Sequence, residues 1–509
     1  MQVLRRFFSF SDSDRQIFVC MGAFLFLGYI CFASAGTMSR FPTKTHLVEM
    51  QADAFRHGQV SLLVKPAPEL LWTENPYDHA NQKFWLWDAI YFQGKYYTYW
   101  GPVPALLVAA VKSLTRLNSL PDQYPCLFFA LARLALSLTL IWQTWCLFGR
   151  RNPWVLAACG LVMGLANPFP YLLSLADVYA TAILAGQAFS LAGLSLALHA
   201  MTGGRGRKGI LVAAGCCWAL AFGSRWALLP ALGFLAVITA LAIASRMGRV
   251  WRQGFAVAIL SLAAPMLLGL VSLGWYNWVR FGDPFETGIH YTLTLLTLTK
   301  MMNAGYIAIN SYLYWLKPPD FIAQFPFLFV LENPSPPIPW FVASPPMPYH
   351  LKEPIAGILW MQPFAVFALP AAQYAWAAKA RIYHTFLPSS PGAATPQALG
   401  WLITACAGYT IFAMAPLLTF WMASMRYTAD FSSTMLLLAC IGGMLMQEKF
   451  SQASGWKVIY KLLFVVIVGI TVLIGALVWV DCDHGYLERF NPELLERFIK
   501  LFGYRIGNP

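Results

Sequence analysis

The chain has 509 residues, of which 58% are hydrophobic and only 11% are charged, and its formal net charge is +13. Apolar runs long enough to cross about 30 Å of hydrocarbon recur along it, which predicts a polytopic membrane protein and excludes a soluble enzyme. No basic patch interleaved with aromatic residues lies in a soluble stretch, so the positive charge indicates cytoplasmic loops and not a nucleic-acid partner.

Twelve apolar runs follow one another as candidate helices. They lie near residues 17–36, 101–117, 125–147, 153–172, 177–200, 208–223, 226–245, 253–278, 354–377, 398–421, 429–447 and 458–481. The first run follows a basic N-terminus, as a signal peptide would. We interpret it as a membrane span because it is long and because no small-residue cleavage site precedes the loop that follows.

Lys and Arg clusters between the runs predict the topology, since such clusters favour the cytoplasmic side. They lie at residues 150–151, 205–208, 246–252, 379–381 and 449–457. Strict alternation places them all on one side only if one run does not cross. Run 101–117 is the weakest, because it opens with Gly-Pro-Val-Pro and soon reaches Lys112. We therefore predict an all-α membrane protein of about eleven transmembrane helices plus a juxtamembrane helix.

This topology gathers the polar, proline-rich material on the outer side of the bilayer. The predicted units are a cytoplasmic N-terminus (1–16), a membrane domain (17–481) with outer loops at 37–100 and 279–353, and an outer tail (482–509). The proline-rich stretches 333–340 and 344–348 cannot continue a helix, so we expect irregular backbone outside the bilayer. Such a segment is either a lid over a site or a plain surface linker.

Two outer acids are candidates for proton transfer. Asp88 closes the first outer loop among tryptophans, and a partly desolvated carboxylate has a raised pKa suited to a general base. The alternative is a simple ion pair with Lys95. Asp177 opens the run near 177–200, where the alternative is an N-cap at the helix start.

Arginines supply the complementary charge. Three lie at the predicted outer face, where no positive-inside tendency explains them: Arg225, Arg280 and Arg426. A guanidinium there suits a phosphate or pyrophosphate through bidentate contact. Ion pairs of Arg280 with Asp283 and of Arg426 with Asp430 are the alternative. Arg133, inside a span, needs either a partner in the bundle or a path to the surface.

The order of these features resembles the type C glycosyltransferase superfamily of polytopic membrane enzymes. The motifs that carry the resemblance are Gly-Lys-Tyr-Tyr-Thr-Tyr-Trp-Gly-Pro-Val-Pro at 94–104, Gly-Arg-Arg at 149–151, Arg-Phe-Gly-Asp-Pro-Phe-Glu-Thr-Gly at 280–288 and Arg-Tyr at 426–427. The chain looks most like bacterial members related to the protein O-mannosyltransferase and aminoarabinose transferase groups.

The resemblance implies sugar transfer at the outer face of the bacterial inner membrane, with the N-terminus inside. The implied donor is a polyprenyl-phosphate sugar, and the implied acceptor is a saccharide, a lipid or a protein. A first-loop carboxylate would deprotonate the acceptor, and basic groups would hold the leaving phosphate. We assign the phosphate to Arg225, Arg280, Arg426 and Lys95, and the substrate to Tyr97, Tyr99, Trp100 and His290. A divalent cation serves some branches, but no residue here is predicted as a metal ligand.

One departure from the family matters. Its better-known branches carry an acid pair soon after the first span, and Thr43-Lys44 stands there in this chain. We therefore rank Asp88 first as the base and then Asp53 and Glu49, which would share one face of a helix. His46 and His57 lie in the same stretch, and Asp177 matches a second family acid.

Two other functions fit a basic protein with eleven or twelve spans. A transporter or flippase of lipid-linked saccharides would favour charges at mid-span and internal repeats, and the sequence has neither strongly. An O-antigen ligase or polymerase would also carry outer arginines in a large loop.

Overall fold

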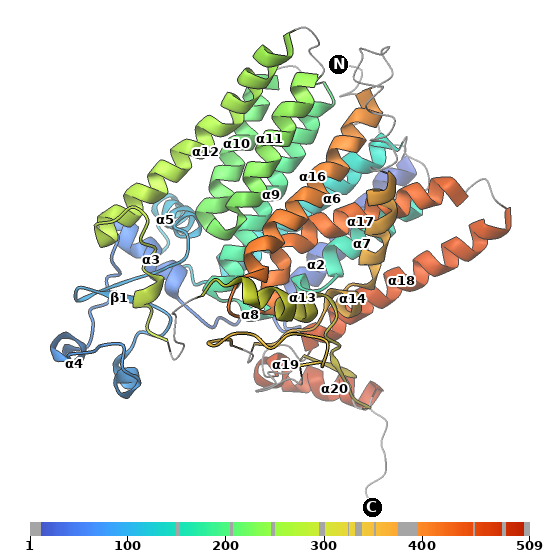
Figure 1. Cartoon of the computed structure of the whole chain (residues 1–509). Coiled ribbons are helices and arrows are strands. Elements are labelled where there is room, and N and C mark those ends of the chain that lie inside the picture. Colours follow the sequence, from blue (N-terminus) through green and yellow to red (C-terminus); the bar gives the residue numbers. More distant parts are fainter. Residues whose placement is uncertain are drawn as a thin grey trace, which may run out of the picture.

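Long apolar helices run side by side as one tilted bundle in the computed structural model of the chain (Figure 1). The structure describes residues 12–148, 153–203, 207–245, 250–294, 301–323, 325–330, 338–350, 353–374, 394–450, 454–480 and 485–502. Within these residues, nine helices are long and apolar enough to cross a membrane. The predicted all-α membrane class is therefore confirmed.

Several of these spans are single helices and others are built from two consecutive helices. The single ones are α2 (Asp12–Ala33), α6 (Gln123–Leu147), α9 (Val178–Met201), α12 (Trp251–Phe281), α16 (Ala394–Leu418) and α18 (Ser454–Val480). The composite ones are α7 (Pro153–Leu165) with α8 (Phe169–Leu175), η2 (Trp226–Leu228) with α11 (Leu229–Ser245), and η7 (Met425–Thr428) with α17 (Ala429–Phe450).

Two further predicted spans differ from this set. Helix α10 (Arg207–Ser224) packs between α9 and α12, but it opens with two basic residues (Figure 1). The run at 354–377 is interrupted at Pro363, where α14 (Ile358–Met361) gives way to the 3-10 helix η6 (Pro363–Phe367), because proline supplies no N–H for the preceding turn. The total of eleven spans stays a prediction.

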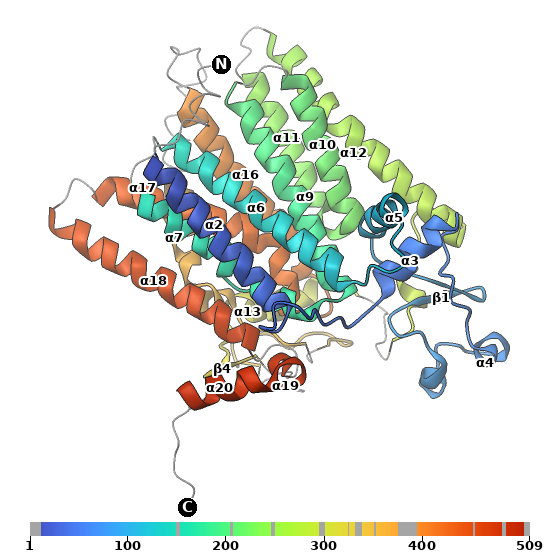
Figure 2. The ribbon, with the colours of Figure 1, turned by 180° about the vertical axis from the view of Figure 1, so that it is seen from behind.

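The predicted juxtamembrane helix is α5 (Val103–Thr115). Its 13 residues span about 20 Å, which is too short for the hydrocarbon core. It lies at the loop-bearing end of the bundle beside α3 (Leu47–Arg56), as the view from behind also shows (Figure 2).

The same end of the bundle holds all the larger connections that the structure describes (Figures 1 and 2). They contain α4 (Pro68–Trp72), η1 (His79–Phe84), β1 (Ile90–Phe92), β2 (Lys95–Tyr97), η4 (Ile289–Tyr291), η5 (Ala304–Tyr306), α13 (Ile307–Trp315), β3 (Asp320–Phe321), β4 (Leu328–Phe329), α14, α19 (Tyr486–Phe490) and α20 (Pro492–Phe502). Lys208 and Arg252 begin helices at the opposite end. This arrangement matches the predicted alternation of spans.

Parts of that prediction fall outside the described residues. These are the basic residues at 150–151, 205, 246, 249, 379 and 381, the proline-rich stretch 331–337, and the tail segments 481–484 and 503–509. The described stretch 338–350 is irregular, as its prolines predict. Its role as a lid stays a prediction.

The first outer loop docks on the bundle through a short hairpin. Strands β1 and β2 pair antiparallel around Gln93-Gly94, and the positive φ angles of +48° and +73° there form a two-residue turn that suits the strand twist. Ile90 also bridges Thr292, so the hairpin joins the segment after α12. At its end, a Cβ on Gly101 would lie 2.0 Å from the Gly223 carbonyl oxygen, which places the loop directly on α10.

Close helix packing gives a first prediction, on two glycines of α18. A Cβ on Gly475 would lie 1.9 Å from the Leu165 carbonyl oxygen, whereas a Cβ on Gly469 would meet nothing within 4 Å. Gly475→Ala should therefore lower the free energy of unfolding by about 1–3 kcal/mol, because a backbone carbonyl cannot move aside as a side chain can. Thermal unfolding in detergent measures this, with Gly469→Ala as the control. Equal stability of the two variants would contradict the packing.

Candidate functional site

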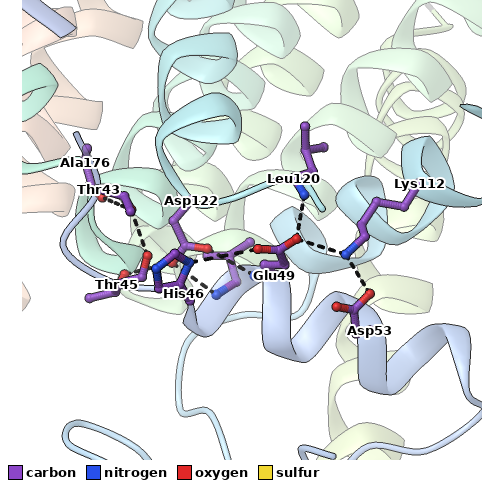
Figure 3. Close-up of polar contacts among 10 residues, drawn as sticks. Thr43, Thr45, His46, Glu49, Asp53, Lys112, Leu120, Asp122 and Ala176 are labelled. Atoms are coloured by element: carbon purple, nitrogen blue, oxygen red, sulfur yellow. Dashed lines mark hydrogen bonds and ion pairs between the residues drawn. The ribbon is translucent and has the colours of Figure 1, made fainter. Parts of the chain in front are cut away.

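Helix α3 is fixed to α5 by a buried lysine (Figure 3). The Nζ of Lys112 lies 3.0 Å from Glu49 Oε1 and 2.7 Å from Asp53 Oδ1, and its side chain is fully buried. Glu49 and Asp53 thus share a helix face, as predicted, but that face is turned to Lys112. These contacts give both acids a structural partner away from Asp88.

Asp122 joins the start of α3 to the start of α9 (Figure 3). Its carboxylate accepts hydrogen bonds from the Thr45 hydroxyl at 2.7 Å and from the Glu49 backbone N–H at 3.0 Å. The same Thr45 hydroxyl oxygen accepts the Val178 N–H at 3.0 Å. Burial raises the pKa of Asp122 to about 6, against the effect of these hydrogen bonds. Residues 43–45 are therefore held against the first turn of α9.

Asp88 lies where the first outer loop meets the bundle. Its φ of +61° is in the left-handed region that aspartate tolerates better than most residues, and its N–H donates to the Leu293 carbonyl at 3.1 Å. The Tyr179 hydroxyl donates to its carboxylate. Burial raises the pKa of Asp88 to about 6, while Tyr179 and Arg426 oppose that rise. This carboxylate is thus ionised near neutral pH and still basic enough to accept a proton.

The alternative ion pair between Asp88 and Lys95 is wrong. Lys95 is exposed on the hairpin, opposite Phe92 in the strand register. The charged groups that act on Asp88 are Arg426, Asp177 and Glu353.

Aromatic hydroxyls orient the Asp88 carboxylate. The Tyr99 hydroxyl donates to the Tyr179 hydroxyl at 2.8 Å, and Tyr179 in turn donates to Asp88. Trp100 stacks on Tyr99 with ring centroids 4.0 Å apart and meets the Tyr179 ring edge-on at 5.0 Å. The indole Nε1 of Trp100 is buried and has no hydrogen-bond partner among the described residues.

Arg426 faces the same group of residues from η7, the 3-10 helix that precedes α17. Its Nη2 lies 3.3 Å from Glu353 Oε2, and its guanidinium covers the Tyr179 ring at 4.5 Å. The Nε of Arg426 is buried without a hydrogen-bond partner in the described part of the chain. An arginine with an unused donor between two acids is equipped to bind a further anion.

Asp177 combines a structural task with a place in the site. Its Oδ1 accepts the Ala180 N–H at 2.6 Å, so the N-cap expected as an alternative is confirmed. Burial raises the pKa of Asp177, whereas Arg426 and Lys44 act to lower it. The preceding residue, Ala176, has a φ of +41°, a strained conformation of the kind that recurs at functional sites.

The other two arginines of the predicted phosphate site, Arg225 and Arg280, have partners within the protein. Arg225 Nε lies 2.6 Å from Asp430, so the predicted pairing of Asp430 with Arg426 is wrong. Two residues that lie 205 positions apart cannot be paired from the sequence alone.

Arg280 fastens the hairpin to α12. It donates to the Thr98 carbonyl and to Asn277 Oδ1, both at 2.6 Å, and lies 4.0 Å from the Tyr276 ring. The predicted pair with Asp283 is wrong, because Asp283 accepts the Phe285 N–H at the turn after the helix.

Arg133 has its partners within the bundle. It donates to the Met163 carbonyl at 2.7 Å and to the Tyr29 hydroxyl at 3.2 Å, and its guanidinium stacks on Phe169 at 3.2 Å. Hydrogen bonds and an aromatic face thus stabilise this charge inside the bundle.

The structure brings together some of the predicted site residues and separates others. Those gathered in one cluster are Asp88, Asp177, Tyr99, Trp100 and Arg426. Those that lie elsewhere are Asp53, Lys95, Arg280, Tyr97, which packs on Phe281 at 5.6 Å, and His290, which is exposed. Arg225 approaches the cluster through the Tyr427 ring at 5.1 Å.

Sequence reasoning missed three members of this cluster: Tyr179, Glu353 and Lys44. Tyr179 had a readable signal, since it follows the outer acid Asp177 by two residues. Glu353 lies shortly after the proline-rich stretch 344–348, and no local sequence pattern singles it out. Lys44 stands where the resemblance to type C glycosyltransferases implies an acid pair, and that difference was the signal.

The buried lysine generates the second prediction. Lys112→Met keeps the apolar stem but leaves Glu49 and Asp53 without a cation, so the free energy of unfolding should fall by about 3 kcal/mol. Thermal unfolding and amide hydrogen exchange over α3 measure this. Lys500, whose side chain is 68% exposed, pairs with Glu496 at 2.6 Å and provides the control, because exposed pairs contribute little. A Lys112→Met protein as stable as Lys500→Met would show that Lys112 does not stabilise the contact between α3 and α5.

Comparisons with known proteins bear on the fold. No family model matches the chain, and no curated protein matches it. Its fold is similar to that of an oligosaccharyltransferase from Archaeoglobus fulgidus in the apo form, with a TM-score of 0.50 and 11% identity over 97% of this chain and 60% of that one. The chain thus spans about three-fifths of that protein's length. This likeness confirms the fold that the sequence resemblance implied.

Two other solved structures are similar at lower scores. One is the archaeal oligosaccharyltransferase AglB from Archaeoglobus fulgidus in complex with an inhibitory peptide and a dolichol-phosphate, with a TM-score of 0.47 and 11% identity over 98% of this chain and 61% of that one. The other is ArnT from Cupriavidus metallidurans bound to undecaprenyl phosphate, with a TM-score of 0.41 and 10% identity over 95% of this chain and 78% of that one.

Proposed function

We propose that this chain, whose fold is that of the type C glycosyltransferases, moves a sugar from a polyprenyl-phosphate donor to an acceptor hydroxyl at the outer face of the bacterial inner membrane. The observation that carries the proposal is the Asp88 carboxylate, largely buried, hydrogen-bonded by Tyr179 and beside the Arg426 guanidinium. Sugar transfer from a phosphate needs a base for the acceptor and a cation for the leaving group.

The chemistry follows from these two groups. The acceptor hydroxyl donates a hydrogen bond to Asp88, and its oxygen attacks the anomeric carbon of the donor sugar. As the new glycosidic bond forms, the hydroxyl proton passes to the Asp88 carboxylate. The bond from the anomeric carbon to the phosphate oxygen breaks, and the electron pair leaves with the polyprenyl phosphate. The anomeric configuration is therefore inverted.

Fixed groups around Asp88 lower the barrier to this step. The Arg426 guanidinium opposes the negative charge that develops on the departing phosphate, at no reorganisation cost during the reaction. The donor chain from Tyr99 through Tyr179 holds the Asp88 carboxylate in one orientation. Asp177 and Glu353 keep Arg426 in place, and Arg225 neutralises Asp430 below it.

Asp88→Asn tests the assignment of the base. Asparagine has the same size and tolerates a left-handed φ, so the variant removes the charge without straining the loop. The transfer rate should fall by about two orders of magnitude or more, with thermal stability retained. The measurement is transfer of radiolabelled sugar from polyprenyl-phosphate sugars by the purified protein.

The control for this variant is Asp78→Asn. Asp78 is an exposed acid of the same loop and is the N-cap of η1, where asparagine caps a helix equally well. Equal transfer by all three proteins would show that Asp88 is not the base. Movement of the lipid across the bilayer without a glycosidic product would identify a transporter instead.

The raised pKa of Asp88 predicts the pH dependence. Only the unprotonated carboxylate accepts a proton, and its pKa is raised to about 6, so the rate should be level above neutral pH and fall about tenfold per unit below pH 6. Tyr179→Phe removes a hydrogen bond that lowers this pKa, so its acid limb should move to higher pH. Single-turnover rates between pH 4.5 and 8 measure both limbs. An acid limb near pH 4 would mean that an exposed carboxylate acts as the base.

A further inference from the structure

Three carboxylates, from Asp88, Asp177 and Glu353, converge on one region of the site. Convergent carboxylates are typical ligands of a divalent cation. Some type C transferases use such a cation. Asp177 Oδ1 is occupied by the Ala180 N–H at 2.6 Å. Glu353 is paired with Arg426 at 3.3 Å. Within the described residues, no group of three or more His, Cys, Asp or Glu side chains is placed to hold a metal ion.

These carboxylates face a guanidinium instead of enclosing a metal site. Arg426 lies against Glu353 and acts on both Asp88 and Asp177. A guanidinium has a fixed positive charge and a fork of donors, so it supplies the charge of a cation and directional hydrogen bonds together. The donor set of this site therefore does not fit a divalent metal.

A second cation, Lys44, comes from the first outer loop, and its backbone is held in place. The backbone N–H of Lys44 donates to the Ala176 carbonyl at 3.4 Å, and the Thr43 hydroxyl donates to the same carbonyl at 3.3 Å. On the other side of Lys44, the Thr45 hydroxyl accepts the Val178 N–H. Together these contacts hold the backbone of Lys44 against the turn that carries Asp177, and Figure 3 shows the contact of Thr43 with Ala176. The exposed ammonium of Lys44 is one of the two cations that act on Asp177.

Unused donors in the same place indicate that a ligand with acceptor oxygens binds there. Arg426 Nε and Trp100 Nε1 are both buried and lack a hydrogen-bond partner among the described residues. Both side chains contact the ring of Tyr179, at 4.5 Å and 5.0 Å. Nearly all buried donors in proteins have a hydrogen-bond partner. A phosphate offers several acceptor oxygens at once.

We propose that Lys44 and Arg426 bind the phosphate of the lipid donor in place of a divalent metal ion, with the Trp100 indole as an additional donor. The proposal rests on the proposed function for the identity of the phosphate as that of a lipid. Lys44 acts on Asp177 and Arg426 pairs with Glu353, so two of the three acids around the clamp formed by Lys44 and Arg426 are compensated. The site thus accepts a phosphate without first acquiring a metal.

Ligand binding tests the clamp independently of catalysis. The purified full-length protein is titrated with undecaprenyl phosphate, either with EDTA or with Mg²⁺ or Mn²⁺, and the matched probe is undecaprenol, which lacks the phosphate. We expect the same Kd with chelator and with metal. Undecaprenol should bind about tenfold or more weakly, since hydrogen bonds to charged groups account for that difference. Loss of binding in EDTA that Mn²⁺ restores would overturn the proposal.

Single substitutions then identify the cation. Lys44→Gln should weaken binding of undecaprenyl phosphate about tenfold and leave binding of undecaprenol unchanged. Lys44 is exposed, so this variant is expected to fold, and gel filtration with thermal unfolding checks this. Lys65→Gln, an exposed lysine elsewhere in the same loop, is the control. Equal binding by Lys44→Gln and the wild type would overturn the role of Lys44.

The outcomes separate this inference from the function it rests on. Sugar transfer that persists while Lys44→Gln binds the phosphate as the wild type does would refute the clamp alone. Metal-independent binding that depends on Lys44, in a protein that transfers no sugar, would refute the proposed transferase and leave the clamp intact.

Discussion

One carboxylate, that of Asp122, holds two helix starts together, and the site depends on that junction. Asp122 caps α3 from outside that helix, and through the Thr45 hydroxyl it also reaches the first N–H of α9. Helix starts leave several N–H groups unsatisfied, and outside partners are needed where water is scarce. The first outer loop is thereby docked on the bundle at the point where α9 presents Asp177 and Tyr179.

Docking matters because the candidate site is assembled from distant parts of the chain. Asp88 and Trp100 come from the first outer loop, Tyr179 from α9, Arg426 from η7, and Glu353 from the segment before α14. No two neighbouring helices could form it alone. The helices of the bundle and the loops at one end of it both contribute side chains to the candidate site.

Hydropathy and the free-energy cost of buried charge explain which spans and which site residues could be predicted from the sequence. Water is absent from the hydrocarbon, so spans must be apolar and charged residues near their ends stand out, which is why Asp88, Asp177 and Arg426 could be selected. Their partners could not, since the Arg225 and Asp430 pair joins residues 205 positions apart. The ion pairs of Lys112 could not be predicted either, because Lys112 lies within an apolar run and its partners, Glu49 and Asp53, belong to another helix.

The pairing of two loops at the same end of the bundle links Asp88 to a segment far along the chain. Asp88 donates its N–H to Leu293, and Leu293 donates back to the Ala89 carbonyl at 2.9 Å, next to the bridge between Ile90 and Thr292. Asp88 itself lies in a turn before β1, with a φ of +61°, so this pairing and not strand alternation fixes the direction of its carboxylate. The segment that follows α12 therefore supports the backbone that carries the proposed base, so a change in that segment is expected to move Asp88.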